Sequence, residues 1–185
     1  MHHNKTREII LCSLFASLIT AGAFIKIPVP LVPFTLQFLF TNMAGLLLGS
    51  KLAFISVMIY IVSGLLGLPV FAQGGGISYI FQPSFGYLLG FALGAFVTGK
   101  ISEAFSGNIS FKVLLTASFS GLFIVYALGM IYYALMSNFY LGNPIGLWPL
   151  FLYCFILAVP GDIVLCFMSA SLGKILIPLT KSLRS

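Results

Sequence analysis

The sequence has very little charge. Only 6% of its 185 residues are Asp, Glu, Lys or Arg, whereas a soluble globular domain carries roughly a quarter. Apolar residues make up 60% of the chain, and the mean hydropathy is +1.13. This composition excludes a soluble fold and predicts an all-α integral membrane protein. The net charge of +6 does not indicate nucleic-acid binding, because the basic residues are scattered singly between apolar blocks.

The groups that catalysis needs are equally scarce. The chain has three acids, no histidine after His3, and no Walker A, HExxH or GxSxG motif. Asp162 is the only acid inside an apolar run, so no second intramembrane carboxylate is available for acid–base chemistry. The cysteines Cys12, Cys154 and Cys166 lie in apolar runs without a CxxC pair. We therefore expect no enzyme activity, no metal site and no cofactor, and ATP hydrolysis would require other subunits.

Six apolar blocks approach the length that crosses a bilayer, which is roughly 17 to 25 helical residues. The predicted helices cover residues 9–25, 34–49, 52–68, 85–99, 113–136 and 148–172. The first block is not followed by a cleavage-like site and a polar domain, so it is predicted to be a retained helix rather than a signal peptide. The sequence thus predicts a single transmembrane domain over residues 1–185.

The distribution of basic residues predicts the orientation of these helices. With six crossings, both termini and the connections at 50–51 and 100–112 share one side, which then holds eight of the nine basic residues. Lys26 is the only cation on the other side. Because the positive side of a membrane protein is cytoplasmic, both termini are predicted to be cytoplasmic. Glu8 and Glu103 fall on the same side and are predicted to be solvated.

Three unusual connections are predicted on the outer side. Residues 26–37 contain three prolines, which force an extended segment, and residues 137–147 contain a further Gly and Pro. Residues 71–91 contain three consecutive glycines, each of which costs about 1 kcal/mol in a helix interior. Stiff, glycine-rich and nearly uncharged outer connections suggest that they fold over a ligand. The alternative is that they are short apolar connectors.

Asp162 is the strongest candidate for a functional residue. It follows Pro160-Gly161, which is expected to kink the sixth helix. A carboxylate at membrane depth costs several kcal/mol unless it faces a cavity and has partners. We therefore predict that Asp162 binds a ligand. The alternative is a hydrogen bond between helices, with Asp162 protonated or paired to a tyrosine.

Three glutamines lie near the same outer face: Gln37, Gln73 and Gln82. Each amide offers both a donor and an acceptor, which suits a neutral polar ligand with paired N–H and C=O groups. The alternative is that each caps loop backbone.

The outer face also carries candidate aromatic and cationic contacts. Tyr79 and Tyr87 are predicted to pack on a ligand ring, and Gly74 and Gly75 to let the backbone approach the ligand closely. Lys26 either pairs with a ligand carboxylate or anchors the end of the first helix by snorkelling.

Three segments together resemble a known family. They are IPVPLVPFTLQ after the first helix, GGGISYIFQPSFGYLLGF leading into the fourth, and AVPGDIVL in the sixth. In this order they resemble the BioY family, the biotin-specific S components of energy-coupling factor (ECF) transporters of the bacterial or archaeal cell membrane. The resemblance covers residues 9–176. It implies a six-helix S-component fold that captures biotin near the outer face, together with a transmembrane coupling subunit and two ATPase subunits as partners.

The resemblance also implies roles for individual residues. The matching ligand-site positions are Gln73, Gly75, Tyr79, Tyr87 and Asp162. The small-residue face of the first helix, which makes the docking contact in the family, falls on Ser13, Ala16, Ser17 and Thr20.

The chain departs from the family pattern at one position. Leu165 stands where members often carry a lysine. The contribution of that lysine would either come from another residue, with Lys26 as the candidate, or be absent. Two alternatives stay open: an S component for another vitamin such as thiamine or riboflavin, and a structural membrane protein without a ligand.

Overall fold

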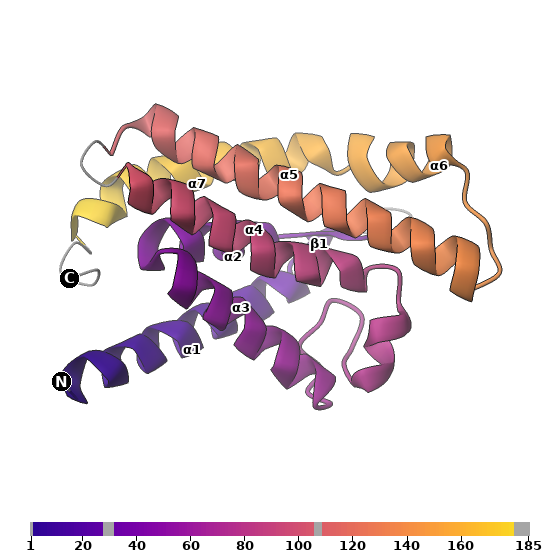
Figure 1. The fold of residues 1–185 in the computed structure, drawn as a ribbon, viewed down its shortest axis with the longest axis horizontal. Coiled ribbons are helices and arrows are strands. Elements are labelled where there is room, and N and C mark those ends of the chain that lie inside the picture. The colour runs from indigo at the N-terminus through magenta and orange to yellow at the C-terminus, as the bar shows by residue number, and fades with distance from the viewer. Residues whose placement is uncertain (1, 28–31, 106–108, 180–185) are drawn as a thin grey trace.

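The computed structural model describes residues 2–27, 32–105 and 109–179 (Figure 1). Residues 28–31 of the predicted proline turn, and Lys181 and Arg184 of the predicted cytoplasmic set, lie outside the described residues.

Helices dominate the described part of the chain. Their order is α1 (His2–Phe24), β1 (Lys26–Ile27), β2 (Phe34–Thr35), α2 (Gln37–Leu48), α3 (Ser50–Leu65), the 3-10 helix η1 (Ile77–Phe81), α4 (Phe85–Ala104), α5 (Phe111–Leu135), the π-helix η2 (Met136–Tyr140), α6 (Leu147–Phe151), the π-helix η3 (Leu152–Ile156) and α7 (Val159–Leu179). The two short strands pair antiparallel, with Lys26 opposite Thr35.

Four helical stretches within the described residues are long and apolar enough to cross a membrane. They are Lys5–Phe24, Phe85–Ala104, Phe111–Tyr140 and Leu147–Leu179. The apolar helices α2 and α3 are shorter, with 12 and 16 residues. At a rise of 1.5 Å per residue they extend about 18 and 24 Å, against a hydrocarbon core of about 30 Å. The chain is therefore a multi-pass membrane protein, and α2 and α3 extend over less than the full thickness of the hydrocarbon core.

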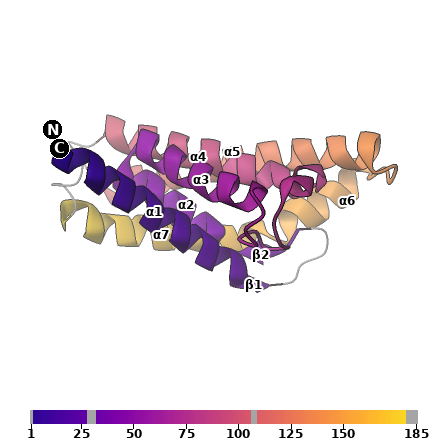
Figure 2. The same cartoon turned by 90° about the horizontal axis from the view of Figure 1, so that it is seen from below.

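Successive long helices run back and forth along one axis of the molecule (Figures 1 and 2). The first turn of α1 and the last turn of α7 lie at the same end. The β1–β2 hairpin, η1 and α6 lie toward the opposite end. The unusual segments of the sequence therefore gather at the end away from the termini.

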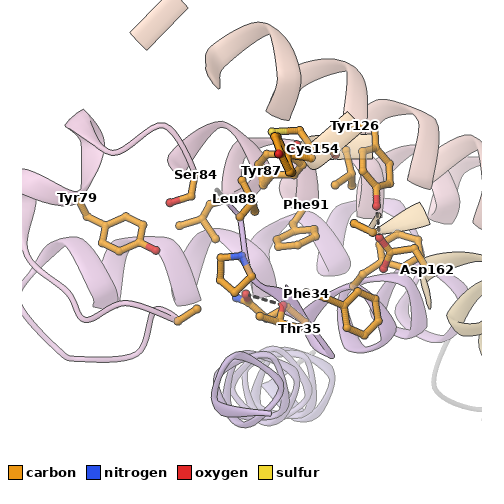
Figure 3. Close-up of a pocket in the computed structure, with 18 residues that line it drawn as sticks. Phe34, Thr35, Tyr79, Ser84, Tyr87, Leu88, Phe91, Tyr126, Cys154 and Asp162 are labelled. Atoms are coloured by element: carbon orange, nitrogen blue, oxygen red, sulfur yellow. Dashed lines mark hydrogen bonds between the residues drawn. The ribbon is translucent and has the colours of Figure 1, made fainter. Parts of the chain in front are cut away.

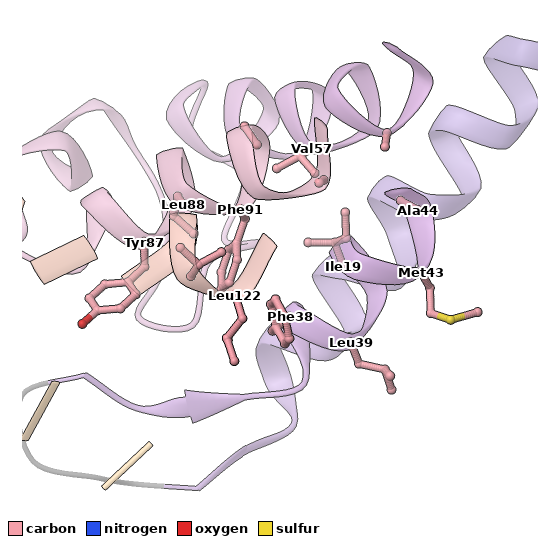
Figure 4. Close-up of a cluster of buried hydrophobic side chains, with 14 of the residues drawn as sticks. Ile19, Phe38, Leu39, Met43, Ala44, Val57, Tyr87, Leu88, Phe91 and Leu122 are labelled. Carbon is pink, nitrogen blue, oxygen red and sulfur yellow. The ribbon is translucent and has the colours of Figure 1, made fainter. Parts of the chain in front are cut away.

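Helix α2 occupies the middle of the bundle. Eleven of its 12 residues are buried, and it contacts α1, α3, α4, α5 and α7. Its Phe38 belongs to a core that also contains Ile19 of α1, Val57 of α3, Leu88 of α4 and Leu122 of α5 (Figure 4). Because neighbouring helices surround α2, its short length does not expose its ends to lipid.

Helices α4 and α5 have the most extensive contact of any pair of described helices, and glycines on α4 allow their close approach. Gly86, Gly90 and Gly94 recur every four residues and so share one face of α4. A Cβ on Gly90 would lie 2.8 Å from the Cα of Val125, and one on Gly94 would lie 2.9 Å from the carbonyl oxygen of Gly121. This small-residue face lets the two backbones touch, as is typical of membrane helices. The small-residue face predicted from the sequence lies on the first helix, and the one on α4 was not predicted.

Glu103 has a structural role that the sequence analysis missed. Its side chain is exposed, as predicted, but the carboxylate also accepts hydrogen bonds from the backbone N–H and the hydroxyl of Ser50, at 2.6 and 2.8 Å. Ser50 begins α3, directly after the left-handed Gly49, whose φ is +85°. A carboxylate is well suited to the N-terminus of a helix, because the first backbone N–H groups lack helical partners. Glu103 thus ties α4 to the α2–α3 turn.

The last predicted helix is divided into three segments. The interruption lies at the turn after η3, just before Val159, and not at Pro160-Gly161 where a kink was expected. Pro160 instead lies in the first turn of α7, where its missing N–H leaves no helical hydrogen bond unmade. The predicted outer loop at 137–147 also differs, because π-helix η2 continues α5 to Tyr140.

Replacing Gly90 with alanine is expected to destabilise the protein. The added Cβ meets the backbone of Val125, which cannot rotate away, so α4 and α5 must separate. Overpacking of this kind costs about 1 to 3 kcal/mol. Thermal unfolding of the detergent-purified protein should show a lower midpoint for Gly90→Ala. Gly146→Ala is the matched control, since a Cβ there would lie 3.4 Å from its nearest neighbour, the Cδ of Pro149. Equal midpoints for the two variants would contradict the packing argument.

Candidate functional site

A pocket of about 660 Å³, counted with its open mouth, lies at the end of the molecule that carries the hairpin (Figure 3). Its walls come from β2 and α2, from η1 and α4, and from α5, η3 and α7. The lining residues are Val32, Pro33, Phe34, Thr35, Gln37, Phe38, Ala72, Tyr79, Ser84, Tyr87, Leu88, Phe91, Val125, Tyr126, Tyr153, Cys154, Ala158 and Asp162.

Contacts between segments that are distant in the sequence hold η1 and the residues before it in place beside the pocket. The Lys26 ammonium donates to the carbonyl oxygen of Ala72 over 2.7 Å, which joins β1 to the glycine-containing segment. The Tyr132 hydroxyl of α5 donates to the carbonyl of Ile80 in η1. Phe81 of η1 stacks on Tyr140, with ring centroids 5.0 Å apart. These contacts dock η1 against α5 and its π-helical extension.

Asp162 and Tyr126 form the polar centre of the pocket. The Tyr126 hydroxyl donates to Oδ2 of Asp162 over 2.5 Å, and both side chains line the pocket (Figure 3). Asp162 is 9% exposed and lies in the first turn of α7, where the helix dipole favours a negative group. No other described side chain donates to the carboxylate, so Oδ1 keeps its acceptor capacity. From the sequence, Asp162 was expected either to bind a ligand or to pair with a tyrosine. In the structure it lines the pocket and also pairs with Tyr126.

One wall of the pocket consists of residues spaced by four. Cys154, Ala158 and Asp162 all line it, and they run from η3 into α7. The Tyr87 hydroxyl of α4 donates to the carbonyl of Cys154 over 3.1 Å, and the Tyr87 ring meets that of Tyr126 edge to face at 6.1 Å. A π-helical stretch releases backbone carbonyls from the α-helical pattern. The π-helix η3 thus gains a hydrogen bond from Tyr87 of α4, and the small side chains of Cys154 and Ala158 line the pocket.

Gln37 supplies a second polar wall. Its Oε1 accepts from the Thr35 hydroxyl at 3.1 Å, and its Nε2 donates to the Tyr60 hydroxyl at 2.6 Å. Each end of the amide therefore has one contact made and one hydrogen-bonding position left. Gln37 is the first residue of α2, so helix formation itself aims it at the pocket.

The glycine segment makes close contacts within the protein itself. Gly74 has a φ of +119°, and its backbone pairs with Phe71 in a tight turn. A Cβ on Gly75 would overlap the carbonyl of Leu68, so this glycine allows close approach to protein backbone. The turn buries Phe71, which is 1% exposed, against the ring of Tyr79 at a centroid distance of 4.4 Å.

Of the predicted ligand-binding residues, Asp162, Gln37, Tyr79 and Tyr87 line the pocket. Gln73, Gly74, Gly75, Gln82 and Lys26 are not among its lining residues. Gln73 is exposed, and Gln82 caps the end of η1 by donating its backbone N–H to Tyr79.

Burial raises the pKa of Tyr79, which lies outside the membrane-spanning helices, above its usual range. Its hydroxyl is therefore neutral at physiological pH and keeps its proton as a donor.

The described lining of the pocket contains no lysine or arginine. Leu165, at the position where the family often has lysine, is 4% exposed and packs in the core. Lys26 is the nearest candidate cation, because its hydrogen-bond partner Ala72 lines the pocket. Within the described residues, no group of His, Cys, Asp and Glu is arranged to hold a metal ion.

Several lining residues were not singled out from the sequence. Tyr126 is the most important, and Phe34, Phe91 and Tyr153 add aromatic surface. An intramembrane tyrosine was named only as a possible class of partner for Asp162. No local signal distinguishes Tyr126 from other tyrosines in the same helix.

The four predicted docking residues of α1 line a second hollow. This α1–α3 groove has about 700 Å³ of open volume, and its walls are Ser13, Ala16, Ser17 and Thr20 of α1 with Ile59, Tyr60, Ser63, Leu68 and Val70. The Ser17 hydroxyl donates to the carbonyl of Ser13, and the Thr20 hydroxyl to that of Ala16, each over 2.9 Å. These two hydroxyls thus bond their own helix, and the α1 wall consists of small side chains.

Comparisons with known proteins identify the relatives of this chain. The model of the BioY family matches residues 1–182. A probable biotin transporter BioY from Lysinibacillus sphaericus is 41% identical over 185 residues, which is 100% of this chain and 94% of the relative. The biotin transporter BioY of Thermotoga maritima is 42% identical over 135 residues, covering 72% of this chain and 76% of the relative.

The fold has a counterpart among solved structures. The crystal structure, at 2.1 Å, of the S-component for biotin from an ECF-type ABC transporter superposes with a TM-score of 0.83 at 26% identity. The match covers 95% of this chain and 93% of that one. The fold is therefore an S-component fold, and the family model and the two relatives place the whole chain in one group of proteins: it belongs to the BioY family.

Proposed function

We propose that this protein is the biotin-capturing S component of an ECF-type vitamin uptake transporter. The observation that carries the proposal is a pocket, largely apolar and aromatic, whose buried carboxylate Asp162 has one oxygen held by Tyr126 and the other free. The names of its relatives and of the matching structure identify the ligand class. The chain has no ATPase motif, so transport depends on a coupling subunit and two ATPase subunits.

The chemistry of biotin matches the polar groups of this pocket. Its ureido ring has two N–H donors and one carbonyl, and its thioether ring is apolar. Asp162 Oδ1 accepts from a ureido N–H, and the remaining N–H of Gln37 is the candidate donor to the ureido oxygen. Tyr79, Tyr87 and Phe91 cover the apolar ring. A ligand that left these buried groups unpaired would lose about 1 to 3 kcal/mol for each, which gives the site its selectivity.

The carboxylate tail of biotin needs a partner outside the lining. In our proposal Lys26 exchanges its bond to the Ala72 carbonyl for the ligand carboxylate at the pocket mouth. Gln73, Gly74, Gly75 and Gln82 belong to the flanking segment, and their role is to shape this mouth.

The proposed topology has six crossings and two cytoplasmic termini in the cell membrane. The back-and-forth course of the helices and the shared end of α1 and α7 support it. The eight-to-one distribution of basic residues sets its direction. In this orientation the pocket opens to the outside, where a captured vitamin would arrive.

The α1–α3 groove is the proposed docking site for the coupling subunit. Its α1 wall of small residues lets another membrane helix approach closely. Ser13, Ala16, Ser17 and Thr20 make the contact in this proposal.

Biotin titrated into the purified protein should give saturable binding, whereas thiamine and riboflavin should not. Asp162→Ala should weaken biotin binding by about tenfold to a hundredfold, because a charged hydrogen bond contributes about 1.5 to 3 kcal/mol. Isothermal titration calorimetry measures both. Tyr126→Phe should have a smaller effect, since it leaves the carboxylate present. Unchanged affinity in Asp162→Ala would remove the residue from the site, and preference for another vitamin would contradict the ligand.

Lys26→Gln should weaken binding of biotin but not of biotin amide, because only the free acid offers a charge to Lys26. An exposed charge pair contributes up to about 1 kcal/mol, so the expected loss is about fivefold. The comparison of the two ligands in one titration series isolates the tail. Lys51→Gln, an exposed lysine at the other end of the molecule, is the control and should bind both ligands like the wild type. An equal loss for biotin and its amide would refute the proposed contact.

Ala16→Leu should abolish co-purification with the coupling subunit and ATPases while the isolated protein still binds biotin. The larger side chain fills the groove beside Ser13 and Thr20. Affinity capture of the tagged S component, followed by detection of the partner subunits, is the measurement. Ala134→Leu places the same added bulk on α5 and should leave the complex intact. Full recovery of the partners with Ala16→Leu would exclude this face.

A further inference from the structure

The pocket and the α1–α3 groove share a wall. Gln37 lines the pocket and Tyr60 lines the groove. The two side chains are 3% and 1% exposed, and Gln37 Nε2 donates to the Tyr60 hydroxyl over 2.6 Å. This hydrogen bond links a residue of the pocket to a residue of the α1–α3 groove.

This hydrogen bond belongs to a longer chain. On the pocket side, the Thr35 hydroxyl donates to Gln37 Oε1 over 3.1 Å. On the groove side, the Tyr60 hydroxyl donates to the carbonyl of Val70 over 3.3 Å. A phenol has a single proton, which Tyr60 gives to Val70, so it acts only as an acceptor toward Gln37. The direction of the chain is therefore fixed, from a pocket residue to a groove residue.

Ring contacts provide a second connection between the same two sites. The Tyr60 ring meets Phe71 edge to face at 5.4 Å, and Phe71 meets the pocket residue Tyr79 at 4.4 Å. Phe71 also lies against Gly64 of α3, where no side chain separates ring from backbone. Protein interiors are close-packed, so a displaced ring in this row displaces its neighbour.

A ligand in the pocket acts directly on Gln37, in the wall that the pocket shares with the α1–α3 groove. The amide of Gln37 has one N–H and one Oε1 position left for a ligand. A ligand that uses them turns or polarises the amide, and either change alters the bond that Tyr60 accepts. Tyr60 cannot respond alone, because its hydroxyl bonds Gln37 of the pocket and Val70 of the groove. Its ring contacts Phe71, which in turn contacts the pocket residue Tyr79.

We propose that Tyr60 is a positioning residue that couples the occupancy of the pocket to the shape of the α1–α3 groove. The empty and the ligand-loaded protein would then present different surfaces to whatever docks on α1 and α3. The proposal rests on the proposed function in one respect, that the pocket binds biotin. Thermodynamic linkage requires the reverse effect as well: occupation of the groove changes the affinity of the pocket by the same factor.

A fluorophore in the groove can report this coupling. Ser17→Cys offers an exposed attachment point on the α1 wall, while Cys12, Cys154 and Cys166 are buried and should resist labelling. Biotin should change the emission of the labelled protein. Adding Tyr60→Phe keeps the ring but removes the hydroxyl. It should abolish most of that change at saturating biotin, while calorimetry shows Kd raised by no more than about tenfold.

Tyr133→Phe is the matched control, because Tyr133 is a buried tyrosine that lines neither hollow and should leave the emission change intact. Gln37→Met removes the same hydrogen bond from the pocket side and should also abolish the change, which keeps the test valid if Tyr60→Phe folds poorly. The outcomes are separable. Absence of biotin binding in the calorimeter overturns the proposed function. Binding with an unresponsive label overturns the coupling. A response in Tyr60→Phe and in Gln37→Met as large as in the labelled protein that keeps Tyr60 and Gln37 overturns it as well.

Discussion

The hydrogen bond between Tyr126 and Asp162 is the interaction on which the rest of the site depends. A carboxylate inside an apolar bundle is tolerated only with a partner and access to a polar cavity. Tyr126 supplies the partner from α5, and the pocket supplies the cavity. The bond fixes the start of α7 against the middle of α5. It occupies one carboxylate oxygen, and no other described side chain donates to the second.

Helix packing determines whether that bond can form. The glycine face of α4 brings this helix against α5, which sets Tyr87 beside Tyr126 with ring centroids 6.1 Å apart. Tyr87 then reaches across to the carbonyl of Cys154, so α4 also holds the irregular segment before α7. The position of one carboxylate thus follows from glycines on a helix that does not carry it.

Polar side chains contribute to two different surfaces. In the α1–α3 groove, the hydroxyls of Ser17 and Thr20 bond carbonyls of their own helix. In the pocket, Gln37 and Asp162 each make a contact and retain further hydrogen-bonding capacity. The first surface suits another apolar helix, and the second suits a small polar ligand. Tyr60 lies between them, with its ring in the groove wall and its hydroxyl bonded to the pocket.

The sequence by itself determined the membrane character and the approximate helix positions, and it singled out Asp162 as a buried acid, because hydropathy and an isolated intramembrane charge are local properties. It also directed attention to Gln37, Tyr79 and Tyr87, which lie beside helix-breaking segments. Only the tertiary structure decided that Tyr126, 36 residues from Asp162, is its partner. It also showed that Gly75 makes room for the Leu68 carbonyl. Such pairings depend on which helix faces meet and in what register, and composition and spacing along one helix do not specify the face of another.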